Sequence, residues 1–273
     1  MPTETKIAKI NKIISKKPYK VKNGTYLFLK GVTDPTQTTE NSVLGKIQEY
    51  IKKKPDVYNK LISIFSPVMV TPIYTKELRK FVSLYAKDKI LINIGSGPGQ
   101  LLNNVHIIEI DQFAFQGVDI VADATSLPIR SSSVDAVVSV AVLEHVERPD
   151  LVINEAYRVL KTNGSIFCYV PFIVGYHAAP NDYYRWTKNG LQQSFSKFKS
   201  VKIFVGAGPT SGMLWIVQEW LALVLSFGIP VIHDVLFIFL MVLFSPLKLL
   251  DIFLWKLPNA EKISSCFFVT GKK

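Results

Sequence analysis

The chain has 273 residues and a formal net charge of +11, and thirteen Lys against five acidic residues place +8 of that charge in residues 1–60. A chain of this length can bury one sizeable core and carry an appendage. The charge favours an anionic partner, and because RRM, KH and zinc-finger patterns are absent, we expect a membrane surface and no nucleic acid.

The two cysteines, Cys168 and Cys266, both fall inside predicted strands. This placement predicts reduced core thiols and argues against a disulfide framework or a metal site. The first residues are charged but lack the apolar stretch of a signal peptide, so we expect a location on the cytoplasmic side of a membrane.

Residues 1–85 are expected to form a basic helical extension. Within residues 1–20, isoleucines recur at helical spacing among lysines: Ile7, Ile10, Ile13 and Ile14. This pattern favours an amphipathic helix lying on an anionic bilayer, with a solvated tail as the alternative. Residues 21–45 are polar and predict a loop. Further helices are expected over residues 45–54, 56–65 and 76–86.

Residues 86–273 alternate apolar runs with helical segments, which predicts an α/β domain. The first run, residues 90–94, leads into Gly95, Gly97 and Gly99. Glycines after a buried parallel strand let the backbone approach a ligand, because they lack a Cβ atom. Further strands are predicted over residues 105–111, 118–122, 134–140, 165–170, 201–205 and 265–270, and helices over residues 149–160 and 187–195.

Residues 209–258 are unlike the rest of the domain. Two apolar runs, Trp220–Ile232 and Val235–Leu247, meet at His233 and Asp234. Each run would be about 20 Å long as a helix, shorter than a hydrocarbon core of roughly 30 Å. We expect a hairpin that dips into one leaflet; a full two-helix span and a dimer interface with a second copy of the chain are the alternatives.

Five segments in register carry a resemblance to a known family: NIGSGPG at residues 93–99, EID at 109–111, VADATSLPI at 121–129, VDAVVSVAVLEHV at 134–146 and EAYRVLKTNG at 155–164. They resemble class I S-adenosylmethionine-dependent methyltransferases of the methyltransferase type 11 kind. The resemblance implies a Rossmann-like, seven-stranded, mostly parallel sheet with an antiparallel last strand. The helical extension would precede this sheet, and the apolar hairpin would lie between strands six and seven.

The resemblance also implies S-adenosyl-L-methionine as the cofactor. Asp111 ends the second strand, where a carboxylate can accept hydrogen bonds from ribose hydroxyls; a strand-end carboxylate that faces water is the alternative. Asp123 follows the third strand, where the family contacts the adenine amino group; helix capping is the alternative. Asn93 stands where the family has an acidic residue, so it brings no charge. The expected cofactor-binding residues are Asn93, Gly95, Gly97, Gly99, Asp111, Asp123 and Ala124.

Glu144 and His145 follow the fourth strand, which in the family abuts the transferred methyl group. We expect them to orient substrate or remove a proton, or else to shape the loop. Some relatives bind a metal through an E-x-x-E-H arrangement, but Ala141 replaces the first glutamate, so we expect no metal.

The long aromatic loop over residues 171–187 is expected to be a substrate lid. His177 is a candidate general base near neutral pH. Asp182, Tyr183 and Arg185 are expected to position an oxygen or an anionic group; loop packing and an internal Asp182–Arg185 ion pair are the alternatives.

Only six residues, 112–117, join the second and third strands, which leaves no room for a crossover helix. We therefore expect the N-terminal helices or the apolar hairpin to cover the exposed sheet face. The function expected from the whole sequence is a membrane-associated methyltransferase for a lipid-linked, glycan or other amphipathic small-molecule acceptor. A catalytically inactive membrane scaffold is the alternative.

Overall fold

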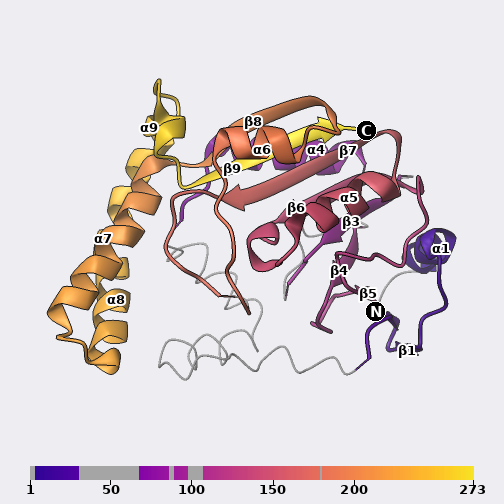
Figure 1. The fold of residues 1–273 in the computed structure, drawn as a ribbon, viewed down its shortest axis with the longest axis horizontal. Helices are drawn as coiled ribbons and strands as arrows, with labels where there is room; N and C mark the ends of the chain where they lie inside the picture. The colour runs from indigo at the N-terminus through magenta and orange to yellow at the C-terminus, as the bar shows by residue number, and fades with distance from the viewer. Residues whose placement is uncertain (1–3, 31–67, 86–88, 98–106, 179) are drawn as a thin grey trace.

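The computed structural model describes residues 4–30, 68–85, 89–97, 107–178 and 180–273. Their strands form a sheet in the order β1-β2-β5-β4-β3-β6-β7-β9-β8 (Figure 1). The strands are β1 (Lys20–Lys22), β2 (Thr25–Leu27), β3 (Leu91–Ile94), β4 (Ile108–Asp111), β5 (Ile120–Val121), β6 (Val134–Val140), β7 (Leu160–Pro171), β8 (Lys199–Ala207) and β9 (Cys266–Lys272).

The strands from β3 to β9 form the sheet that the sequence predicts. β5, β4, β3, β6 and β7 run parallel, and β9 runs antiparallel to its neighbours β7 and β8. The Rossmann-like, mostly parallel arrangement with an antiparallel last strand is therefore confirmed. The chain winds from β3 to one edge and then returns to β6 on the other side of β3. Ligands of open α/β sheets bind at such a switch point, beyond the carboxyl ends of the strands.

Two short strands extend this sheet beyond the seven expected. β1 pairs antiparallel with β2 through a turn at Asn23 and Gly24, whose φ angles are 51° and 84°. An Asn-Gly pair favours this left-handed hairpin turn. β2 then pairs in parallel with β5. The loop predicted over residues 21–45 is therefore wrong for residues 21–27, while residues 31–45 lie outside the described part of the chain.

Helices cover both faces of the sheet. α1 (Glu4–Ile13), α5 (Pro149–Val159) and α6 (Lys188–Ser194) pack on one face, and α4 (Pro72–Leu84) packs on the other. β3 divides its side chains between them, with Ile92 in the first core cluster and Leu91 in the second, as the alternation of a strand requires. The helix expected over residues 76–86 starts earlier, at Pro72, where Thr71 caps it. The helices expected over residues 45–54 and 56–65 lie outside the described residues.

α1 packs against the sheet instead of presenting its apolar face to a bilayer. Ile10 and Ile13 are fully buried in the core, and Lys6 Nζ lies 2.6 Å from a carboxylate oxygen of Asp119, just before β5. The membrane-lying helix expected for residues 1–20 is therefore wrong, because its isoleucines are already covered. α1 helps to cover the sheet face near β4 and β5, which the short link at residues 112–117 leaves without a crossover helix.

The apolar segment between β8 and β9 forms two long helices. α7 (Pro209–Leu225) and α8 (Pro230–Phe244) lie side by side and extend away from the sheet (Figure 1). They meet at residues 226–229, so His233 and Asp234 lie within α8, and the junction expected at these two residues is wrong. Gly228, with φ of 78°, and Pro230 form the turn instead of interrupting a helix. Shorter helical segments follow: η2 (Ser245–Leu250), α9 (Asp251–Leu254) and η3 (Ala260–Lys262).

The two ends of the apolar segment are tied to each other by a buried carboxylate. Asp251 Oδ1 accepts a hydrogen bond from the N–H of Thr210 at 2.7 Å, and its Oδ2 accepts from the N–H and the hydroxyl of Ser211 at 2.9 and 2.7 Å. An acidic side chain at a helix N-terminus satisfies N–H groups that lack partners within the helix. Asp251 therefore ties α9 to the first turn of α7.

Away from this carboxylate, the segment exposes many large apolar side chains. Phe227 is 89% exposed and Phe253 is 70% exposed. The stretch Pro230–Leu254 is long and apolar enough to cross a membrane, by length and composition alone. Other exposed apolar side chains on the two helices are Trp220, Leu223, Val231 and Phe239.

Candidate functional site

The glycine turn follows β3 at the switch point of the sheet. Gly95 and Gly97 have φ angles of 72° and 63°, in the left-handed region that favours glycine. A Cβ atom on Gly95 would lie 2.3 Å from Cγ2 of Val142, whereas one on Gly97 would meet no atom of the described residues within 4 Å. Among the described residues, the turn is thus closed against Val142 at Gly95, and no atom lies within 4 Å of the Cβ direction of Gly97. Gly99 lies outside the described residues.

Asp111 lies directly beside this turn. Its Oδ2 accepts a hydrogen bond from the N–H of Gly97 at 2.8 Å, and its Oδ1 accepts from the N–H of Phe113 at 2.9 Å. Burial raises the pKa of the Asp111 carboxyl group, although these N–H groups oppose the shift. The structure therefore brings Asp111 and the glycine turn together, as the sequence predicts.

Asp123 and Ala124 follow β5 at the same edge of the sheet. β4 and β5 are paired in parallel, with Asp111 opposite Val121, so Asp123 lies two residues beyond that pair. The Asp123 side chain is exposed, and its Oδ1 accepts hydrogen bonds from the N–H and the hydroxyl of Thr125 at 2.8 and 2.7 Å. This local turn fixes the side chain at the surface, and its predicted contact with adenine stays a prediction.

Asn93 is turned toward the neighbouring strand. It lies opposite Glu109, and its Nδ2 donates a hydrogen bond to Glu109 Oε2 at 2.7 Å. Both side chains are buried, and Asn93 Oδ1 has no hydrogen-bond partner among the described residues. The amide therefore supports the strand pair, and the predicted contact of Asn93 with the cofactor is not tested by this arrangement.

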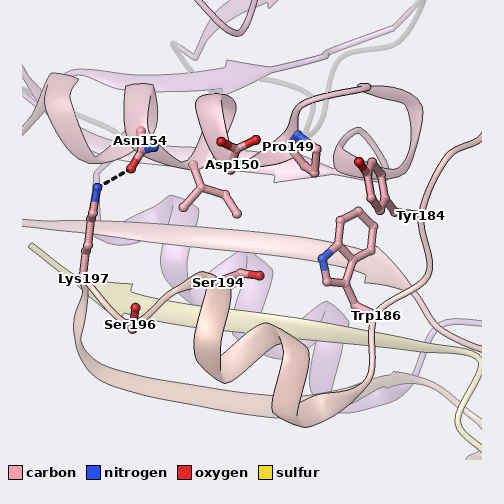
Figure 2. Close-up of a pocket in the computed structure, with 9 residues that line it drawn as sticks. Pro149, Asp150, Asn154, Tyr184, Trp186, Ser194, Ser196 and Lys197 are labelled. Carbon is pink, nitrogen blue, oxygen red and sulfur yellow. Dashed lines mark hydrogen bonds between the residues drawn. The ribbon is translucent and has the colours of Figure 1, made fainter.

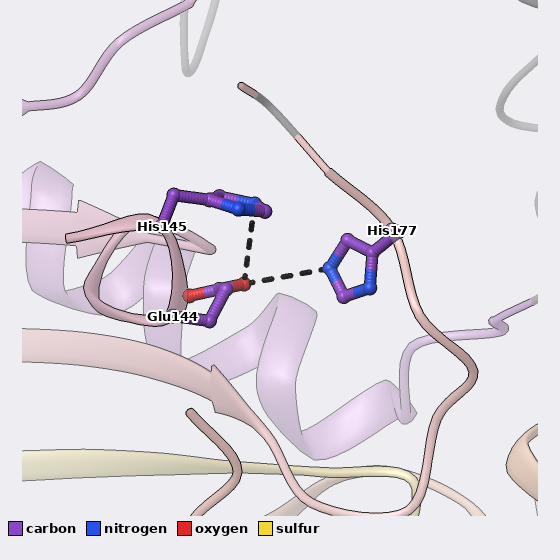
Figure 3. A group of neighbouring side chains, drawn as sticks. All are labelled: Glu144, His145 and His177. Atoms are coloured by element: carbon purple, nitrogen blue, oxygen red, sulfur yellow. Dashed lines mark ion pairs between the residues drawn. The ribbon is translucent and has the colours of Figure 1, made fainter. Parts of the chain in front are cut away.

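Glu144, His145 and His177 form a cluster (Figure 3). Glu144 and His145 lie on η1 (Leu143–His145), directly after β6, and His177 lies on the loop after β7. Glu144 Oε1 is 3.9 Å from Nε2 of His145 and 3.8 Å from Nε2 of His177. Val142, the residue before η1, is the one that closes the turn at Gly95. The cluster is therefore next to the predicted cofactor site.

The loop between β7 and α6 is held by an internal ion pair. Arg185 donates hydrogen bonds from both terminal nitrogens to the two carboxylate oxygens of Asp182. Asp182 Oδ2 also accepts from the N–H of His177 at 2.8 Å, and Arg185 reaches the carbonyl of Gly175 at 2.8 Å. The internal ion pair between Asp182 and Arg185, which the sequence left as the alternative to a substrate contact, is therefore present in the structure. The pair fixes the position of His177.

The charged groups of this loop stabilise the ionised forms of Asp182 and His177. Burial alone would raise the pKa of Asp182, but the hydrogen bonds from Arg185 and from the His177 N–H, together with the charges of His177 and Arg185, outweigh burial and lower the pKa. Burial alone would lower the pKa of His177, but Glu144, the Gly175 carbonyl and Asp182 together raise it. Tyr183 is exposed at the side chain, while its N–H donates to the carbonyl of Glu144 at 2.7 Å.

α7 also contacts this loop. The ring of Trp215 lies 5.5 Å from the ring of His177, centre to centre. A Cβ atom on Gly175 would lie 2.4 Å from the indole nitrogen of Trp215. The loop that carries His177 is thus packed against the first half of the apolar hairpin.

A separate hollow lies between α5 and the residues around α6 (Figure 2). Its volume is about 430 Å³, and Lys197 Nζ donates a hydrogen bond to Asn154 Oδ1 across it at 2.6 Å. Tyr184 and Trp186 border it, whereas the glycine turn does not.

The two buried thiols, Cys168 and Cys266, are free, and burial raises the pKa of Cys266 to about 12. Neither the hollow nor the thiols belong to the predicted cofactor site.

Comparison with known proteins points to one family. Residues 92–168 match the sequence model of the family described as "Methyltransferase domain". The chain carries a class I methyltransferase domain. Its matched segment begins in β3 and ends in β7, and so includes the glycine turn, Asp111, Asp123 and η1. S-adenosyl-L-methionine is the cofactor of this class, and the open side of the turn at Gly97, beside Asp111, fits it.

The methyltransferase domain has curated relatives. The tRNA (carboxymethyluridine(34)-5-O)-methyltransferase ALKBH8 of Mus musculus is 29% identical over 154 residues, and that of Macaca fascicularis is 30% identical over 138 residues. These alignments cover 50% and 45% of this chain but only 22% and 20% of the relatives. The chain thus spans about a fifth of the length of the curated relatives it matches.

Solved methyltransferases resemble the domain at low identity. A methyltransferase from Thermotoga maritima is 14% identical, with a TM-score of 0.47 and coverage of 83% of this chain and 98% of that one. The phosphoethanolamine N-methyltransferase 2 of Haemonchus contortus, in complex with S-adenosyl-L-methionine, is 15% identical, with a TM-score of 0.46 and coverage of 90% and 61%.

Proposed function

We propose that this protein transfers a methyl group from S-adenosyl-L-methionine to a lipid-linked, glycan or other amphipathic small-molecule acceptor at the cytoplasmic face of a membrane. The observation that carries the proposal is the contact between Asp111 and the N–H of Gly97. It places a buried carboxylate beside a glycine turn that is open on one side, at the switch point of the sheet.

The residues of the site divide the work of methyl transfer. The cofactor, when bound, supplies the methyl group and a sulfide leaving group. Asp111 accepts hydrogen bonds from the ribose hydroxyls, and the backbone at Gly95 and Gly97 lies against the rest of the donor. Because the donor is already activated, the protein mainly has to align the acceptor. Glu144 Oε1 and His177 Nε2, 3.8 Å apart, are placed to orient an acceptor hydroxyl.

Asp111→Asn tests the cofactor site by isothermal titration with S-adenosyl-L-homocysteine. The amide can still accept from the N–H of Gly97 but loses the charge that binds the ribose hydroxyls. Hydrogen bonds to charged groups contribute about 1.5–3 kcal/mol, so affinity should fall roughly 10- to 100-fold. Asp150→Asn, at an exposed carboxylate that pairs with Arg148, should leave affinity unchanged. Wild-type protein without measurable affinity would overturn the proposal.

The exposed apolar faces of α7 and α8 support the membrane part of the proposal. Monomeric soluble proteins rarely expose contiguous apolar patches larger than a few hundred Å². Side chains such as Trp220 and Leu223, 60% and 61% exposed, instead suit the boundary between head groups and acyl chains. A dimer interface would use the same side chains, and the oligomeric state in the presence and absence of vesicles separates these two uses.

A tRNA acceptor is the second candidate. The curated relatives are named as tRNA methyltransferases, and the net charge of +11 suits a polyanion. These names favour a nucleic-acid acceptor, whereas the sequence led us to expect no nucleic-acid partner. Transfer of radiolabelled methyl groups into total tRNA, compared with transfer into a membrane lipid extract, distinguishes the acceptors. A protein that binds the cofactor but labels neither pool would favour the catalytically inactive scaffold.

A further inference from the structure

We propose that Glu144, His145 and His177 bind one divalent transition-metal ion, of which Zn²⁺ is the type. The ligand atoms of these side chains all lie within 4.8 Å of one another. Two imidazole nitrogens and one carboxylate are a donor set that Zn²⁺ accepts in catalytic sites, where a fourth position stays open.

The distances within the cluster suit a small ion after minor closure. Ligands about 2.1 Å from a tetrahedral ion lie roughly 3.4 Å from each other. Glu144 Oε1 lies 3.8 and 3.9 Å from the Nε2 atoms of His177 and His145. The histidine rings stand nearly perpendicular, at 88°, with centres 5.2 Å apart. Both carboxylate–imidazole distances therefore exceed the expected separation by about 0.5 Å, and the ligand atoms of the two histidines lie within 4.8 Å of each other, so the rings have to approach further to share an ion.

Glu144 is a buried carboxylate that lacks its own hydrogen bonds. It is 1% exposed, and among the described residues neither of its oxygens has a hydrogen-bond partner. Such a group costs free energy unless a partner compensates it. The nearest nitrogens are those of the two histidines, at ion-pair distance. A cation between the three side chains would satisfy the carboxylate.

The outer nitrogens of both histidines are already occupied. His145 Nδ1 lies 2.6 Å from the carbonyl of Asn181, and His177 Nδ1 lies 3.1 Å from the carbonyl of Gly175. A carbonyl accepts only from a protonated nitrogen, so a proton on Nδ1 would leave the lone pair on Nε2, the atom that lies within 4 Å of Glu144 in both residues; at His177 the guanidinium of Arg185 also lies 3.4 Å from Nδ1. In metal sites, a carbonyl that accepts from the ring nitrogen not bound to the metal holds the histidine in its orientation. The carbonyl contacts thus prepare two nitrogen ligands.

The origin of the third ligand, His177, explains why the sequence predicts no metal site. We expect no metal from the sequence because Ala141 replaces the first glutamate of the E-x-x-E-H arrangement. In the structure, His177 comes from a different loop and supplies the third donor. Ala141 itself adopts φ of 54°, in the left-handed region, immediately before the turn into η1. The metal set is therefore assembled from two loops.

The place of the ion assigns it a role that rests on the proposed methyl transfer. Val142 links η1 to the glycine turn, so an ion on Glu144 would lie at the acceptor side of the cofactor site. It would hold an acceptor hydroxyl and lower its pKa. The O–H proton passes to solvent, an O–C bond forms to the methyl carbon, and the C–S bond breaks with its electron pair on sulfur.

Isothermal titration of ZnCl₂ into the full-length chain tests the site. We expect one ion per chain, and His177→Ala, His145→Ala and Glu144→Gln should each weaken binding by more than the roughly 10- to 100-fold that outer-shell changes cost. His233→Ala is the matched control, because His233 also lies beside carboxylates, 3.4 Å from Glu219 and 3.6 Å from Asp234. Thermal melting without metal shows which variants fold.

Two results would overturn the site: no Zn²⁺ binding by the folded wild type, or equal binding by the folded His177→Ala variant. The open position is tested with Co²⁺, whose visible spectrum should change when azide is added, and an unchanged spectrum would overturn the acceptor role. Titration of the same samples with S-adenosyl-L-homocysteine separates the proposals. Loss of cofactor binding with Zn²⁺ binding intact contradicts the proposed function alone.

Discussion

At the scale of single residues, the two glycines of the turn have different reasons to be glycine. Both have positive φ, which costs other residues roughly 1–2 kcal/mol. At Gly95 an added methyl group would also collide with Val142, whereas at Gly97 it would meet no atom of the described residues within 4 Å. Gly95 is required by packing as well as by its backbone conformation, whereas Gly97 is required by its backbone conformation and lies in the turn proposed to bind the cofactor.

Gly95→Ala and Gly97→Ala should therefore fail in different ways. Gly95→Ala should lower the free energy of unfolding by about 3 kcal/mol or more, since overpacking adds to backbone strain. Gly97→Ala should lower it by only about 1–2 kcal/mol and should weaken S-adenosyl-L-homocysteine binding at least about 10-fold. Urea unfolding and calorimetric titration measure both quantities. Equal loss of stability in the two variants would contradict this distinction.

The residues of the site were predictable to different extents. Gly95, Gly97 and Asp111 follow strand ends whose hydrophobic runs are plain in the sequence, and the structure brings them together. The grouping of His177 with Glu144 was not predictable, because it depends on how a loop 32 residues further along folds back over η1. Asn93 could be assigned to its strand, but its bond to Glu109 depends on the register between two strands.

At the scale of secondary-structure elements, α1 shows why an amphipathic pattern does not name its partner. Its isoleucines and lysines suit a bilayer, yet Ile10 and Ile13 are buried on the sheet. The same apolar stripe fits either surface, and only the tertiary fold decides. β1 and β2 had a local signal in Asn23 and Gly24, which was outweighed by the polar composition around it.

The ion pair between Lys6 and Asp119 should contribute to the docking of α1. Its side chains are only 12% and 4% exposed, and burial raises the pKa of Asp119 although Lys6 opposes the shift. Lys6→Met leaves this carboxylate buried beside an apolar chain, so the free energy of unfolding should fall by about 3 kcal/mol.

Asp119→Asn is the complementary change. The neutral amide keeps an acceptor for the N–H of Glu109, which now donates to Asp119 Oδ2 at 2.8 Å. The double variant should therefore recover part of the stability that Lys6→Met loses, because no buried charge remains unpaired. Denaturant unfolding of the four proteins forms a double-mutant cycle, and strictly additive losses would argue against a coupled pair.

At the scale of the whole molecule, α7 and α8 give the protein an exposed apolar surface at one end of the sheet (Figure 1). The composition of the segment predicted two apolar helices, but not the position of their turn. Gly228 and Pro230 form the junction, five and three residues before the one expected at His233.

Trp220→Glu combined with Phe227→Glu should abolish flotation of the full-length chain with vesicles that contain anionic lipid. The two side chains are 60% and 89% exposed, so charges there cost little folding stability but oppose burial among acyl chains. Leu84→Glu, at a 60% exposed position at the end of α4, is the matched control and should still float. Flotation of the double variant to the wild-type extent would remove the membrane from the proposal.

The packing of Trp215 against Gly175 and His177 has a further consequence for how this protein works. The helix that would touch lipid also supports the loop that carries a reacting group. If α7 seats at a bilayer as proposed, it would fix the angle at which that loop meets the donor, and turnover would become coupled to adsorption. The protein should show interfacial activation, with slow chemistry in free solution and faster chemistry once the hairpin is embedded.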